Sequence, residues 1–81
     1  MTEEDIYRQL TSIFHETFDD DSILLTPALS ADDIEEWDSL SNIRLVVATE
    51  QHFGFRFTTS EVSAFQNVGE FVASILEKSN P

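Results

Sequence analysis

A serine stands at the start of a predicted helix, where its hydroxyl could carry an attached group. Asp38 precedes Ser39, and an aspartate in this position caps a helix by accepting a backbone N–H from the first turn. Ser39 is then the first helical residue, and its hydroxyl faces outward. A phosphoryl group on that oxygen would lie beside unpaired N–H groups at the positive end of the helix dipole. On position alone, however, an ordinary unmodified serine fits better.

The sequence lacks the residues of several other chemistries. The chain has no cysteine, so a disulfide, a thiol nucleophile and a thiolate metal site are excluded. Ser39 has no Gly-x-Ser-x-Gly motif and no base at an activating spacing, which argues against a hydrolase. His15 and His52 are expected at the surface. The acidic stretches 19–21 and 32–36 lack the glycine of a calcium loop, so no metal site is predicted.

Hydrophobic spacing predicts the two helices that must position Ser39. A first helix is expected over 3–18, capped by Thr2, with a core face made of Ile6, Leu10, Ile13 and Phe14. The serine helix is expected over 39–53, ending at Gly54 in left-handed geometry. Because this helix is apolar over a wide arc, we expect neighbours to cover it on more than one side. The apolar residues expected to point into the core are Leu40, Ile43 and Val47.

The rest of the chain predicts a long connection and two further helices. Residues 19–37 are expected to form a loop pinned to the core by some of its apolar residues, with one helical turn within 30–35. A capping box opens a short third helix at Thr58, and Asn67 begins the last helix. The expected fold class is all-α: a small bundle of three longer helices and one short third helix, in a single domain over 1–81.

The charge of the chain restricts its partners. Sixteen acidic residues against four basic ones give a formal net charge of −12 at pH 7. Nucleic acid and anionic membranes would be repelled, so basic protein surfaces are the expected partners, although charge that serves only solubility is the alternative. The sequence shows no signal peptide and no apolar run of membrane-spanning length. We therefore expect a free-standing, monomeric cytoplasmic protein.

Three motifs taken together resemble those of the acyl carrier proteins. They are Asp38-Ser39-Leu40 before an apolar helix, the segment 50–57 with its Phe-Gly turn, and Asn67-Val68-Gly69-Glu70-Phe71. The resemblance covers the chain from about Ile6 to Leu76. It implies that Ser39 carries a covalent 4'-phosphopantetheine arm, transferred from coenzyme A by a phosphopantetheinyl transferase. The thiol of the arm would hold acyl cargo as a thioester, and the chain itself would be a non-catalytic carrier.

The resemblance also implies where partner enzymes bind. The residues expected at that contact are Trp37, Asp38, Leu40, Ile43, Arg44 and Val47. Arg44 replaces the acidic residue usual in fatty-acid carriers, and Ser41 and Thr49 further dilute the acidity expected on the exposed face. The expected clients are therefore acyl-transferring or acyl-activating enzymes of a specialised fatty-acid, polyketide or secondary-metabolite pathway. Trp37 stands where many fatty-acid carriers have a smaller residue, and packing against the helix start explains it better than partner contact does.

Two other functions stay open at this point. The first is an unmodified adaptor or regulatory bundle that docks basic protein surfaces through an acidic serine helix. The second is a peptidyl carrier, although Trp37-Asp38 fits the acyl type better. A test for modification of Ser39 separates the adaptor from both kinds of carrier.

Overall fold

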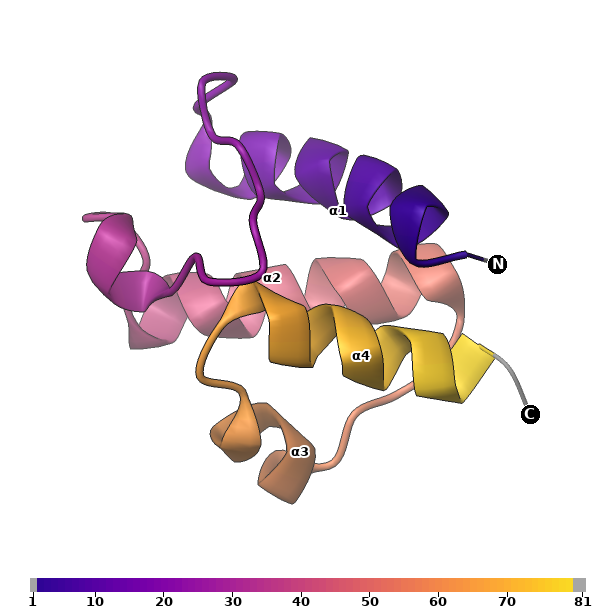
Figure 1. Ribbon diagram of the computed structural model, residues 1–81. Helices are drawn as coiled ribbons and strands as arrows, with labels where there is room; N and C mark the ends of the chain where they lie inside the picture. Colours follow the sequence, from indigo (N-terminus) through magenta and orange to yellow (C-terminus); the bar gives the residue numbers. More distant parts are fainter. Residues whose placement is uncertain (1, 80–81) are drawn as a thin grey trace.

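The computed structural model describes residues 2–79, and within that range all regular secondary structure is helical, without a strand. The elements are α1 (Glu3–Phe18), a 3₁₀ turn η1 (Ala31–Asp33), α2 (Ser39–Phe53), α3 (Thr59–Ala64) and α4 (Val68–Ser79). Figure 1 shows α1, α2 and α4 running alongside one another, with the short α3 set apart below α4. The predicted bundle, with three longer helices, a short third helix and a long first loop, is confirmed.

Side chains and one glycine define the helix ends. Capping boxes form at both predicted places: the Thr2 hydroxyl accepts the N–H of Asp5 at 3.2 Å, and the Thr58 hydroxyl accepts that of Glu61 at 3.1 Å. Gly54 ends α2 with φ of 80°, a left-handed conformation that a glycine adopts without strain. These local signals place the start and the end of α2 where the sequence predicts them.

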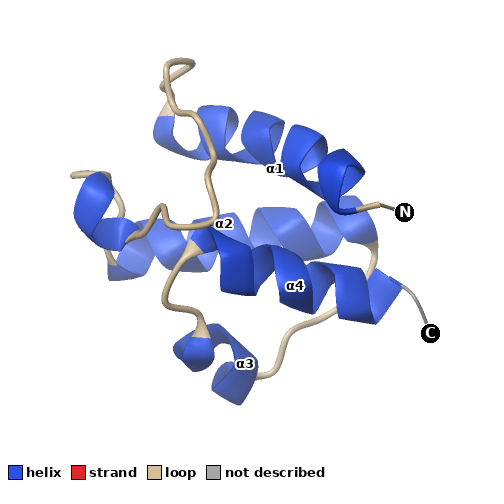
Figure 2. Cartoon of the chain, in the orientation of Figure 1, coloured by secondary structure: helices blue, strands red, loops and turns tan. Residues whose placement is uncertain are grey.

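The long loop between α1 and α2 is fixed to the start of α4 (Figure 2, loops in tan). The N–H of Val68 donates to the Leu29 carbonyl at 2.8 Å, and the N–H of Gly69 donates to the Pro27 carbonyl at 3.0 Å. Gly69 permits this approach, because a Cβ there would lie 3.1 Å from the Pro27 carbonyl oxygen. The loop that leads to Ser39 is therefore fixed in position by hydrogen bonds to α4.

The core lies between α1, α2 and α4, and the loop closes it. The loop contributes Ile23 and Ile34, whereas Leu24 is 79% exposed. Helix residues buried in this cluster are Ile6, Leu10, Ile13 and Phe14 from α1, Leu45 from α2, and Val68, Phe71, Val72 and Ile75 from α4. The predicted core face of α1 is confirmed. Among residues 2–79, no helix is both long enough and apolar enough to cross a membrane.

The orientation of α2 differs from the prediction. Leu40, Ile43 and Val47 were expected in the core, but they are 68%, 60% and 43% exposed. The buried face carries Leu45, Val46 and Thr49 instead. Because α2 is apolar around most of its circumference, spacing alone allowed two faces, and α1 and the loop cover only one of them. The expectation that Thr49 is exposed is wrong as well.

Candidate functional site

Ser39 begins α2 at the surface with its hydroxyl unengaged. Its side chain is exposed and makes no hydrogen bond to another residue in the described range 2–79. The Asp38 carboxylate accepts the backbone N–H of Ser41 at 2.9 Å, as predicted for a cap. The Ser41 hydroxyl turns back to the Glu36 carbonyl at 2.8 Å. The neighbouring polar groups are thus occupied with one another, which leaves the Ser39 oxygen accessible to an incoming molecule.

The cap makes the stability of α2 depend on pH. The hydrogen bond from the Ser41 N–H holds the pKa of the Asp38 carboxyl below its ordinary value of 3.8. A depressed pKa in the folded state adds stability above the ordinary value, and this stability is lost as the pH falls through the folded value. Asp38→Asn keeps a capping acceptor but cannot titrate. We expect the wild type to melt higher than the variant at neutral pH, and the margin to vanish in acid. A margin that stays constant in melts recorded from neutral pH downward would contradict this.

Trp37 fastens the segment before Ser39 to the bundle. Its ring meets Phe14 edge-on, with ring centroids 5.3 Å apart at 87°, and it lies 6.0 Å from the ring of Phe18. Its indole Nε1–H donates to Asn42 Oδ1 at 3.0 Å. Trp37 is only partly exposed and packs against the core cluster. This geometry agrees with the packing interpretation of Trp37.

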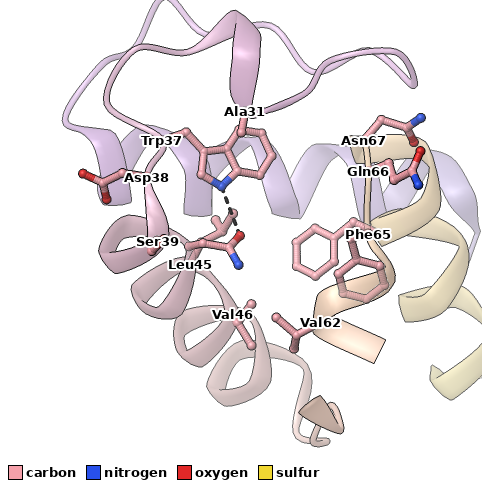
Figure 3. Close-up of a pocket in the computed structure, with 12 residues that line it drawn as sticks. Ala31, Trp37, Asp38, Ser39, Leu45, Val46, Val62, Phe65, Gln66 and Asn67 are labelled. Carbon is pink, nitrogen blue, oxygen red and sulfur yellow. Dashed lines mark hydrogen bonds between the residues drawn. The ribbon is translucent and has the colours of Figure 1, made fainter. Parts of the chain in front are cut away.

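A cavity of about 380 Å³ opens beside Ser39. In Figure 3, Ser39 and Phe65 lie on opposite sides of it, Trp37 closes it above, and Val46 and Val62 face each other below. The Asp38 carboxylate points away from the cavity in the same view. The lining residues not yet mentioned here are Ala31, Asn42, Leu45, Gln66, Asn67 and Phe71. A chain tethered to the Ser39 oxygen would therefore have within reach a hollow with both apolar and polar walls.

The exposed face of α2 is apolar and carries a cation. Leu40, Ile43 and Val47 are exposed together with Arg44, which forms no ion pair with any residue in the described part of the chain. The acidic residues that flank the start of α2 lie before the helix, within 32–38, and its first turn contains none. Glu50 is the acidic residue within α2, and its side chain is engaged, because it accepts the backbone N–H of Phe57 at 2.8 Å. The description of α2 as an acidic docking helix is therefore wrong, although acidic residues do flank its start.

The two histidines make hydrogen-bond contacts with residues that lie far from Ser39 in the sequence. His15 Nε2 lies 2.9 Å from the Ile23 carbonyl oxygen, and His52 Nε2 lies 2.6 Å from Gln9 Oε1. Neither histidine lines the cavity. Within residues 2–79, no group of three or more acidic or histidine side chains is arranged to hold a metal ion. The site consists of an exposed serine, a capped helix start and a cavity.

No family model matches the chain, but the similar proteins and the similar solved structure described here are all acyl carrier proteins. The chain is 33% identical over 82 residues to a meromycolate extension acyl carrier protein of Mycolicibacterium smegmatis, covering 99% of this chain and 83% of that one. It is 30% identical to an acyl carrier protein of Lactobacillus johnsonii, covering 99% and 100%. A solution structure of holo acyl carrier protein from Geobacter metallireducens superposes with a TM-score of 0.86 at 42% identity, covering 90% and 84%.

Proposed function

The chain belongs to the acyl carrier protein family, and on this premise we propose that Ser39 is the attachment point of its 4'-phosphopantetheine arm. The observation that carries the proposal is the exposed, unbonded Ser39 hydroxyl at the first position of α2, beside the cavity. When bound, the arm supplies a thiol that holds an acyl group as a thioester. The whole of 1–81 would then be one carrier domain.

The residues around Ser39 suit a phosphodiester anion. The first turn of α2 contains no acidic residue, and the Asp38 carboxylate is turned toward the Ser41 N–H and away from the cavity. The positive end of the helix dipole favours an anion at this point. Trp37 and the Asp38 cap hold the backbone on both sides of the start of α2, so that Ser39 is presented in one position.

The attachment step requires chemistry that this chain does not offer. The Ser39 oxygen forms a bond to the β-phosphorus of coenzyme A, and the bond from that phosphorus to the bridging oxygen breaks to release 3',5'-ADP. The proton of the hydroxyl must pass to a base. No histidine lines the cavity, so we assign the base and the magnesium ion to a phosphopantetheinyl transferase. The chain is the substrate of that enzyme and performs no catalysis.

We assign partner contact to the exposed face of α2. Leu40, Ile43 and Val47 offer apolar area next to Ser39, and Arg44 offers a cation that favours a carboxylate on the client enzyme. Acidic residues before the helix would meet basic groups at the edge of the same contact. This mixed pattern supports acyl-handling clients of a specialised pathway. The net charge of −12 opposes self-association, which supports a monomer. We propose the cytoplasm as its location.

Intact-mass measurement tests the attachment site. The protein is incubated with coenzyme A, magnesium and a promiscuous phosphopantetheinyl transferase, and we expect the mass to rise by one phosphopantetheine. Ser39→Ala should abolish the gain completely, whereas Ser63→Ala, which removes another exposed helical hydroxyl, should retain it. A wild type that gains nothing would favour the unmodified adaptor. A gain in mass in Ser39→Ala would mean that another residue carries the arm.

A further inference from the structure

The side-chain amide of Asn42 lies in the wall of the cavity, and a hydrogen bond fixes its orientation. The indole N–H of Trp37 can only donate, and it lies 3.0 Å from Asn42 Oδ1. This bond requires the amide oxygen of Asn42 to face Trp37, so the Nδ2 donors must face elsewhere. No acceptor among residues 2–79 takes a hydrogen bond from them. Asn42 therefore presents unused donors at a cavity wall while its oxygen is already engaged.

The surroundings of Asn42 make these donors selective. The same cavity is lined by Leu45 and Val46 from α2 and by Phe65 from the far side (Figure 3). A purely hydrocarbon chain would displace water from the Asn42 amide and offer it no acceptor, which is unfavourable for a polar group. A chain that brings its own oxygen would replace the lost water. The cavity therefore distinguishes between two kinds of cargo that have the same length.

The cavity has room for an acyl chain. Its volume of about 380 Å³ corresponds to about a dozen water-sized groups, at roughly 30 Å³ each. Resting on the proposed function, we propose that this cavity prefers acyl groups bearing a hydroxyl or keto oxygen to hydrocarbon groups of the same length, and that Asn42 Nδ2 donates a hydrogen bond to that oxygen. Asn42 is thus a specificity-determining residue for the cargo. The enzymes that load or use such cargo would be those that make or reduce oxo-acyl and hydroxy-acyl thioesters.

Two matched variants isolate the donor. Asn42→Asp keeps an acceptor for Trp37, removes both donors and adds one negative charge. Asn67→Asp adds the same charge at another cavity-lining residue and preserves the cap of α4, because the Asn67 side-chain oxygen accepts the N–H of Glu70 at 2.9 Å. Each protein is prepared with the unloaded arm, with butyryl and with 3-hydroxybutyryl, using the corresponding coenzyme A compounds. Loading is verified by mass in every sample.

Melting temperature and side-chain amide NMR provide the readouts. We expect wild type loaded with 3-hydroxybutyryl to melt about 4 °C above the butyryl form, as one added hydrogen bond would give. The Asn42 Nδ2 signals should shift between these two forms. The difference in melting temperature should disappear in Asn42→Asp and persist in Asn67→Asp.

Three results would overturn the preference. The first is an equal melting temperature for the two loaded wild-type forms. The second is a difference in melting temperature that survives in Asn42→Asp. The third is a shift of the Asn42 Nδ2 NMR signals that is already complete when the arm carries no cargo. The last result would assign the donor to an oxygen of the arm and not of the cargo. Failure to load the wild type would refute the proposed function, whereas loading without a difference would refute only the cargo preference.

Discussion

Replacing Phe14 by alanine should remove a large part of the protein's stability. Phe14 is fully buried, and its ring lies 5.3 Å from Trp37 and 5.8 Å from Phe18. Truncating a buried phenylalanine costs about 3–5 kcal/mol. At roughly 0.05–0.15 kcal/mol per residue, a chain of 81 residues has about 4–12 kcal/mol in total. Equilibrium unfolding in urea should show the midpoint falling by about a quarter or more.

The control for Phe14→Ala is an apolar side chain in the loop. Leu24 is 79% exposed, so Leu24→Ala should change the free energy of unfolding by about 0.5 kcal/mol at most. Equal shifts in the two variants would mean that the aromatic cluster around Phe14 is not the core. Because the indole of Trp37 rests on Phe14, the variant should also release the segment that leads to Ser39.

Replacing Ile43 by aspartate should leave the fold intact and impair recognition. Ile43 is 60% exposed, between Leu40 and Val47 on the free face of α2. A transferase that reaches Ser39 would have to cover this apolar area, and a carboxylate placed at its centre would be desolvated without a partner. We expect kcat/KM for phosphopantetheine transfer to fall about 10-fold or more, while the melting temperature changes little.

Ala73→Asp is the matched control for this effect. It adds the same charge at an exposed position on α4, away from the free face of α2. Its kcat/KM should stay near that of the wild type. If the two variants are modified equally fast, the exposed face of α2 is not a contact of the transferase, and the net charge alone governs the encounter.

Local signals were sufficient to predict the ends of the helices. Thr58 and Glu61 form a cap within one turn, and Gly54 takes the left-handed conformation that ends α2. Asp38 likewise determines the start of α2, and therefore the position of Ser39, through a contact between residues close in sequence. These features depend on neighbouring residues alone, which is why the sequence could reveal them.

The buried face of α2 could not be predicted in the same way. Both sides of this helix carry large aliphatic residues, and the choice between them depends on where α1 and the loop lie. Thr49 is buried because its hydroxyl donates to the Leu45 carbonyl at 2.8 Å, which satisfies the polar group inside the same helix. The cavity and the bond between Trp37 and Asn42 also require the folded arrangement.

The single tryptophan of the chain gives the protein an intrinsic optical reporter. Trp37 lines the cavity, and its indole N–H is bound to Asn42 in the same wall. Indole emission moves to shorter wavelength when nearby water is displaced. Cargo entering or leaving the hollow should therefore be followed by fluorescence in real time, in the unlabelled wild-type protein.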